Sequence, residues 1–221
     1  MHAAQSFSYA TSQVWQPAVY AHPDAPAALA AGSHWGQQLA RLLLGMQGVY
    51  IYDHRARMMC YVSEGVAKLT GVPVAEFTGE RNFALIHPDD LPIVQEATRL
   101  FNQFIYAYRR SIGPDIVASI DYRLCRPDGS CRRVLRHNSV LEQEPETGNP
   151  VLVAAILTDI TAHKHTTDVR FHLNHPDFTD FVARQPRLRA QPILNCARAA
   201  SDAASDAGPD QPPDCPAAFR E

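Results

Sequence analysis

The chain has 221 residues, 46% of them hydrophobic, which is enough to bury a core and excludes a fully disordered protein. A formal net charge of −3 leaves no basic excess for binding nucleic acid. No stretch approaches the roughly 20 apolar residues of a membrane helix, and no apolar run or basic residue near the start suggests a signal peptide. The five cysteines lack the spacing of a secreted disulfide framework. We therefore expect a cytoplasmic protein.

The N-terminal zone divides into an irregular segment and a helix. Residues 1–32 hold no period of 2 or 3.6 for long and are predicted to be mostly irregular. Ser33 then has the character of an N-cap, and an amphipathic helix is predicted over residues 33–47. Its apolar stripe consists of Trp35, Leu39, Leu42, Leu43 and Met46. A short helix needs a cover, so we expect it to pack on the outer face of a sheet or to pair with its copy in a dimer.

The ordered domain is predicted over residues 48–161. Two short strands and two short helices come first, at residues 49–52, 58–62, 63–69 and 73–77. A long helix follows over residues 91–110, and the preceding Asp89-Asp90 pair is interpreted as its cap rather than as an acid/base pair. Three strands close the domain, at residues 116–126, 131–141 and 151–160. This order predicts an α+β fold with a five-stranded antiparallel sheet and helices on one face.

The last zone, residues 162–221, breaks the pattern. It is rich in proline and contains a run of Ala, Ser and Asp only, at residues 199–207. We predict that it is largely disordered, with minor local structure at Phe178–Phe181 and at 192–194.

The order of elements and several short motifs resemble a PAS domain. The entry to the long helix reads His87-Pro88-Asp89-Asp90, the central hairpin carries Arg126-Pro127-Asp128-Gly129-Ser130, and the exit reads Thr158-Asp159-Ile160-Thr161. The resemblance covers residues 48–161 and is closest to the subgroup with the Arg-x-Asp-Gly-Ser hairpin and the Asp-Ile-Thr exit. Two positions depart from it: Ser63 stands where many members have Asn, and Arg133 where the subgroup usually has an aromatic residue.

The resemblance leaves the cofactor unknown, because members of this family bind haem, flavin, small metabolites or nothing. The long helix has no histidine, so the usual His-ligated haem is not supported, and His137 is interpreted as an ordinary strand residue. The blue-light members need a cysteine just after Asn82, where this chain has Phe83, so covalent flavin chemistry is excluded. Non-covalent flavin stays open.

The resemblance also implies a cavity between the sheet and the long helix. Its expected lining is Phe83, Ile86, Phe101, Tyr122, Leu124, Val134 and Arg136. The alternative is that these side chains simply fill the core. Arg136 is the most informative of them, because an inward guanidinium needs an anion, and a carboxylate ligand would supply one.

The register of the central hairpin decides whether that set shares a face. A plain two-residue turn at Asp128-Gly129 would make Val134 and Arg136 face away from Leu124. A one-residue bulge after the turn would bring them to the same face, as the family resemblance favours. The residues alone leave both registers open.

Other reactive side chains have simpler interpretations. A Cys125–Cys131 disulfide is not expected in a reducing cytoplasm, and buried thiols are the commoner case. His163, His165, His172 and His175 follow no zinc-site spacing. No nucleophile lies in a recognisable catalytic motif, so we expect no enzyme.

Taken together, the sequence predicts a stand-alone PAS sensory module. We expect it to bind a small ligand, to engage other proteins, or both, as a homodimer whose output passes to a separate signalling partner, without nucleic-acid or membrane binding. The alternatives are a ligand-free dimerisation adaptor and, less favoured, a small α+β enzyme.

Overall fold

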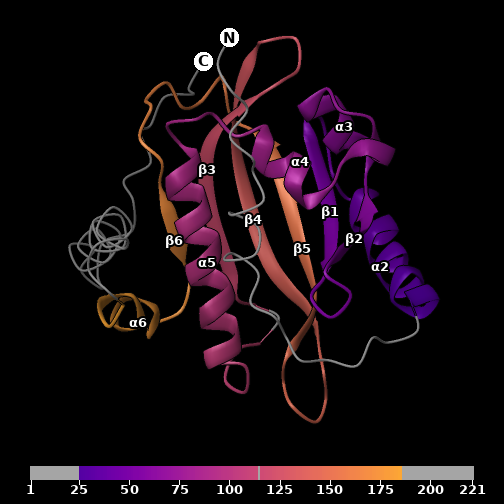
Figure 1. The fold of residues 1–221 in the computed structure, drawn as a ribbon, viewed down its shortest axis with the longest axis vertical. Coiled ribbons are helices and arrows are strands. Elements are labelled where there is room, and N and C mark those ends of the chain that lie inside the picture. The colour runs from indigo at the N-terminus through magenta and orange to yellow at the C-terminus, as the bar shows by residue number, and fades with distance from the viewer. Residues whose placement is uncertain (1–24, 114, 186–221) are drawn as a thin grey trace, which may run out of the picture.

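A computed structural model describes residues 25–113 and 115–185. One six-stranded antiparallel sheet with the order β2-β1-β5-β4-β3-β6 forms its centre (Figure 1). The strands are β1 Gln47–Asp53, β2 Met58–Val62, β3 Val117–Cys125, β4 Cys131–Gln143, β5 Pro150–Asp159 and β6 Phe171–Leu173. The helices are α2 Ala25–Ala40, α3 Glu64–Thr70, the 3-10 helix η1 Val74–Glu76, α4 Gly79–Ala84, α5 Leu91–Ala107 and α6 Phe178–Ala183. The predicted α+β class with an antiparallel sheet is confirmed.

The inner face of the sheet carries the main core, under α3, α4 and α5. Alternate strand residues such as Tyr50, Tyr122 and Val153 turn to this face, as the period of 2 requires. Helix α5 offers Val94, Ala97, Leu100, Phe101, Phe104 and Ile105, all of which are buried. This layer encloses the space in which a ligand site was predicted.

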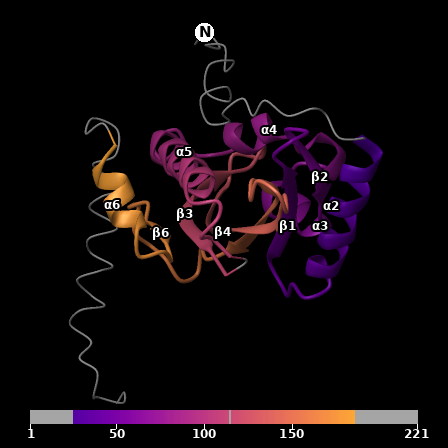
Figure 2. The ribbon, with the colours of Figure 1, turned by 90° about the horizontal axis from the view of Figure 1, so that it is seen from below.

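The outer face carries a second, smaller core under α2. Val49, Ile51, Leu152 and Ala154 form it, and Trp35, Leu39 and Leu43 of the N-terminal region pack against them. Figure 2 shows α2 beside β1 and β2 and away from α5. Gly32 and Gly36 allow this close approach, because a Cβ on either would collide with Cys60 or the Tyr61 ring. Of the two expected roles of this helix, packing on the sheet is the one seen within the chain.

The predicted bounds of this helix were wrong. It begins at Ala25 and ends at Ala40 instead of covering residues 33–47, so the part of the segment 1–32 from residue 25 onward is helical rather than irregular. The alanine-rich stretch before Ser33 is itself a strong helix former, and the chain turns at residues 41–42 to reach β1. Leu42 and Met46 therefore leave the predicted stripe and are 76% and 40% exposed. Residues 1–24 lie outside the described part.

The hairpin between β3 and β4 has the bulged register. Tyr122 lies opposite Val134, and Ile120 lies opposite Arg136. The loop closes through Arg126 N to Ser130 O at 2.7 Å, and Gly129 takes a φ of 84°, which favours glycine. Tyr122, Leu124, Val134 and Arg136 consequently share the inner face of the sheet.

The prediction of five strands and a largely disordered tail also needs correction. Within residues 162–185 the chain returns to the sheet, where Phe171–Leu173 pairs with β3 as strand β6. Helix α6 then places Phe178 and Phe181 against Phe104 of α5. The apolar alternation Val169, Phe171, Leu173 is the physical cause, since all three side chains are buried. Residues 186–221 lie outside the described part.

Candidate functional site

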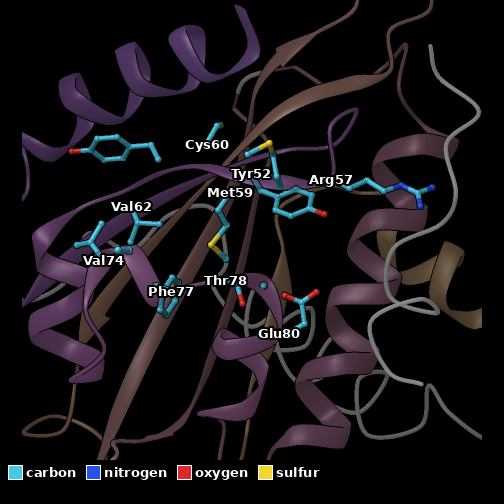
Figure 3. A pocket seen from close by; sticks show the side chains of 13 residues that line it. Tyr52, Arg57, Met59, Cys60, Val62, Val74, Phe77, Thr78 and Glu80 are labelled. Atoms are coloured by element: carbon cyan, nitrogen blue, oxygen red, sulfur yellow. The ribbon is translucent and has the colours of Figure 1, made fainter. Parts of the chain in front are cut away.

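Two cavities adjoin each other on the inner side of the sheet. The larger is an open cleft of about 700 Å³ between β2, η1 and the start of α4 (Figure 3). Its lining exposes polar and apolar surface in nearly equal parts and comes from Tyr52, Arg57, Met58, Met59, Cys60, Tyr61, Val62, Val74, Ala75, Phe77, Thr78, Gly79 and Glu80. Its volume falls in the range typical of small-molecule sites. This cleft was not predicted from the sequence.

The smaller cavity, which we call the inner cavity, measures about 40 Å³ and lies between the sheet, α4 and α5. It is lined by Tyr50, Tyr52, His54, Met59, Gly79, Asn82, Phe83, Thr98, Phe101, Asn102, Arg136, Asn138, Val153 and Ala155. A void of this size holds a few water molecules or one small polar group, because a water needs about 10–15 Å³ on this measure. It is thus a polar recess inside an otherwise dense core.

The structure divides the predicted cavity residues into two groups. Phe83, Phe101 and Arg136 line the inner cavity. The other four are buried in the surrounding core without lining it: Ile86, Tyr122, Leu124 and Val134. The predicted location is therefore occupied partly by a cavity and partly by packed core, which were the two alternatives for this set.

Arg136 is held in the core by neutral groups. It is 3% exposed, its Nη2 donates to Thr98 Oγ1 at 2.9 Å, and its guanidinium lies 5.6 Å from the Tyr122 ring centre. Burial opposes its charge, but the nearby hydroxyls of Tyr50 and Tyr122 outweigh burial and keep the pKa of Arg136 above its usual value. Within the described residues Arg136 forms no ion pair, so its charge lacks a buried counter-ion.

The other residues around the inner cavity do not supply a charge. His54 is buried, and burial lowers its pKa to about 4, so its ring is neutral near pH 7. The remaining lining residues are apolar or carry neutral hydroxyls and amides. Arg136 is therefore the one charged side chain that faces the inner cavity among the residues described there.

Several polar atoms in this region lack hydrogen-bond partners in the described structure. They include Arg136 Nε and Asn82 Oδ1. Asn82 Nδ2 makes only a long contact of 3.5 Å to Tyr50 Oη. Buried polar groups are normally paired, so these atoms mark a polar region inside the core beside the inner cavity.

The cleft and the inner cavity are separated by a thin wall. Tyr52, Met59 and Gly79 line both of them. In Figure 3 the Met59 side chain lies between Tyr52 and Phe77, and the lining also includes Arg57 and Glu80, which carry opposite charges. Met59 is flexible and unbranched, which makes it suited to opening and closing a passage.

The sequence interpretation missed Met59, Asn82, Thr98 and Asn138, which line the inner cavity beside Arg136. A signal for Asn138 was present, because it lies two residues from Arg136 and so shares its face of β4. For Asn82 the periodicity contained no such signal, because helix α4 was not predicted. Thr78 caps the start of this helix, since its Oγ1 accepts a hydrogen bond from Arg81 N at 3.2 Å.

A separate ionic network lies at the entry to α5. Asp90 accepts hydrogen bonds from Arg123 N at 2.7 Å and from Arg123 Nη2 at 2.6 Å, and it makes no side-chain cap of the helix. The predicted capping role was therefore wrong for Asp90. Arg133 pairs with Asp121, which also accepts from Lys164 Nζ at 2.7 Å. An aromatic side chain at position 133 would leave Asp121 with less positive charge around it.

The cysteine prediction also needs correction. Cys125 and Cys131 face each other across the β3–β4 hairpin with Cα atoms 4.0 Å apart and form a disulfide. The bulged register places them opposite each other, which the sequence left open. Cys60 is a free, buried thiol, and burial raises its pKa to about 11, which makes it a poor nucleophile.

No three histidine, cysteine or acidic residues gather as a metal site in the described parts of the chain. Among the same residues, no helix combines the length and apolar character needed to cross a bilayer.

Comparison with known proteins identifies a family for the centre of the chain. Residues 59–157 match the family described as PAS fold. No curated protein matches the sequence. One similar solved structure is the N-terminal domain of a diguanylate cyclase with PAS/PAC sensor from Marinobacter aquaeolei, at 17% identity over 54% of this chain and 99% of that one, with a TM-score of 0.43. Another is the PAS domain of a protein from Colwellia psychrerythraea, at 14% identity over 59% of this chain and 99% of that one, with a TM-score of 0.42.

Proposed function

This chain contains a domain of the PAS fold family, and from that premise we propose that it is a sensory signalling module that works by binding rather than by catalysis. A small molecule places its polar head in the inner cavity, and its presence is passed to a separate partner protein. The observation that carries this proposal is the set of buried, unpaired polar atoms around Arg136. A buried guanidinium without a counter-ion costs free energy, which a domain that only packs its core would avoid.

The path of the signal is part of the same proposal. Arg136 on β4 is bonded to Thr98 on α5, so a ligand at the guanidinium acts on both elements at once. Helix α5 contacts α6 through Phe104, Phe178 and Phe181. A shift of α5 would therefore reach the C-terminal structured segment, where a partner could detect it.

The proposal is tested on the purified full chain by native mass spectrometry before and after denaturation and refolding. We expect a small-molecule adduct that disappears on denaturation, and a rise in the unfolding temperature when the released compound is added back. A protein that carries no adduct, and whose unfolding temperature no compound in a metabolite library changes, would contradict ligand sensing.

The alternative is a ligand-free adaptor, and one observation favours it. Leu42, Leu44 and Met46 are exposed at 76%, 80% and 40% in the connection between α2 and β1. We call these three residues the connector patch. Exposed apolar residues that cluster mark interaction sites more often than chance. We propose that the connector patch is the contact between two copies of this chain in a homodimer, in place of the full helix stripe, because Trp35, Leu39 and Leu43 are engaged by the sheet.

A further inference from the structure

The charge of Arg136 is the starting point for naming the class of ligand. Arg133 provides the comparison, because it lies on the same strand, is as deeply buried and faces the other side of the sheet. Arg133 has the Asp121 carboxylate beside it and Asp90 Oδ2 at 3.7 Å. Arg136 has only hydroxyls, amides and a ring in the described structure. The fold thus compensates one buried guanidinium and leaves the other uncompensated.

The surroundings of Arg136 can complete a site for a carboxylate. Its Nε has no partner, so a donor is available next to the donor at Nη2. The side-chain amide of Asn82 can exchange its oxygen and nitrogen at little cost. In the exchanged orientation Asn82 accepts from Tyr50 Oη and directs N–H groups away from it. Two arginine donors and an amide donor match the acceptor-only chemistry of a carboxylate.

The size of the inner cavity limits what it can hold. About 40 Å³ accommodates the head of a ligand and not a whole metabolite. One guanidinium, with no second cation facing the cavity among the described residues, balances one negative charge. A phosphate ester or a dicarboxylate would bring about two charges into a site with a single positive group. The head group is therefore a monoanion.

The rest of the ligand has a place in the adjoining cleft. Beyond the wall formed by Tyr52, Met59 and Gly79 lie about 700 Å³, and the apolar half of this lining includes Val62, Val74 and Phe77. Because the charged residues Arg57 and Glu80 have opposite signs, the cleft offers no net charge to a second ionic group. The apolar side chains of the cleft favour an aliphatic or aromatic body that packs against them.

We propose that this chain binds a monocarboxylic acid with an apolar body. The carboxylate lies in the inner cavity on Arg136, and the body extends past Met59 into the cleft. This inference rests on the proposed sensory function, since it names the ligand class of the same site.

Isothermal titration calorimetry on the full chain tests the head group with octanoate, octanamide and 1-octanol. We expect octanoate to bind at least about tenfold more tightly than the amide or the alcohol, since a hydrogen bond to a charged group is worth about 1.5–3 kcal/mol. Arg136→Met should abolish that preference. Arg109→Met removes an exposed arginine that lines neither cavity, and this variant should keep the preference. Equal binding of octanoate and octanamide, or unchanged octanoate binding by Arg136→Met, would overturn the inference.

A second variant tests the position of the apolar body and does not depend on Arg136. Met59→Trp places a larger side chain at the wall between the two cavities, so octanoate should bind at least about tenfold more weakly. The binding of acetate should be affected less, because acetate occupies the head site alone. Circular dichroism melts establish that each variant folds. An equal loss for acetate and octanoate would contradict the extended binding mode. If wild type binds none of these acids while native mass spectrometry still finds a released ligand, the carboxylate inference fails and the sensory proposal stands.

Discussion

Arg136 on β4 donates a hydrogen bond to Thr98 Oγ1 on α5 at 2.9 Å, and this bond joins the sheet to the helix beside the inner cavity. The Thr98 hydroxyl donates its own hydrogen bond to Val94 O at 2.8 Å. Its oxygen is therefore an acceptor for Arg136, and the hydroxyl brings no charge. The bond fixes the position of the guanidinium without neutralising it. An anion that competes for the guanidinium would loosen the hold of β4 on α5.

The two buried arginines of β4 should respond differently to removal of their charge. Arg136→Met should change the free energy of unfolding by less than about 1 kcal/mol, because the removal of a buried charge without a counter-ion offsets the loss of its hydrogen bond to Thr98. Arg133→Met should lower it by about 3 kcal/mol, because it removes the main partner of Asp121. Urea unfolding of the ligand-free protein measures both. A large loss of stability in Arg136→Met would mean that the guanidinium is compensated within the fold.

Acid should weaken the link between Asp90 and Arg123. Burial acts to raise the pKa of Asp90, but the hydrogen bonds from Arg123 outweigh it and hold the pKa below its usual value. A carboxyl whose pKa is lower in the folded than in the unfolded state stabilises the fold above its unfolded pKa of about 3.9, and this contribution is lost as the pH falls through the folded pKa.

Asp90→Asn therefore should cost about 2 kcal/mol at pH 7 and progressively less below about pH 4. Urea unfolding at pH 7, 4.5 and 3 follows the difference between variant and wild type. Asp89→Asn is the matched control, because Asp89 is exposed and makes peripheral contacts only, at 3.3 Å to Arg123 and at 3.5 Å to His87 Nδ1. A difference that stays constant across this pH range would show that the charge of Asp90 is not what stabilises the fold.

Reduction of the Cys125–Cys131 disulfide should destabilise the domain modestly. The bond closes a loop with a sequence separation of only 6, for which the chain-entropy account gives about 2 kcal/mol. Dithiothreitol should lower the unfolding temperature of wild type and have no effect on the Cys125→Ser, Cys131→Ser double variant. Thiol labelling under denaturing conditions, with and without reductant, reports the state of the pair. Labelling of both cysteines without reductant would contradict a formed disulfide.

The sequence predicted the class of fold because the strands and the long helix are strongly patterned. It placed β2 at Met58–Val62, the bounds found in the structure, since turns and β-rich residues mark both ends. The residues alone did not decide the hairpin register. The register depends on the φ of 84° at Gly129, which accompanies a shift of the pairing by one residue and cannot be deduced from composition. The family resemblance favoured the bulged register, and that resemblance was based on the order of motifs and not on the local conformation of the turn.

The inner cavity could be predicted only in part for a similar reason. Arg136 and Phe101 belong to long, well-patterned elements, so their inward direction follows once the register is known. Asn82 and Met59 enter the site through α4 and through an irregular pairing between β1 and β2, where the register shifts between Ile51 and Tyr52. Such irregularities depend on contacts between distant segments, which local periodicity does not contain.

Leu39 and Leu42 were predicted on one helical stripe, but only Leu42 belongs to the connector patch, so their substitutions should have different effects. Leu39 packs against the outer core of the sheet, so Leu39→Asp should lower the free energy of unfolding by about 2–4 kcal/mol. Leu42 is 76% exposed, so Leu42→Asp should leave the thermal melt nearly unchanged and weaken the dimer. Multi-angle light scattering over a concentration series measures the dimer, with Arg41→Asp as a control that adds negative charge one residue away. A dimer that survives both Leu42→Asp and Leu44→Asp would place the contact between copies elsewhere on the molecule.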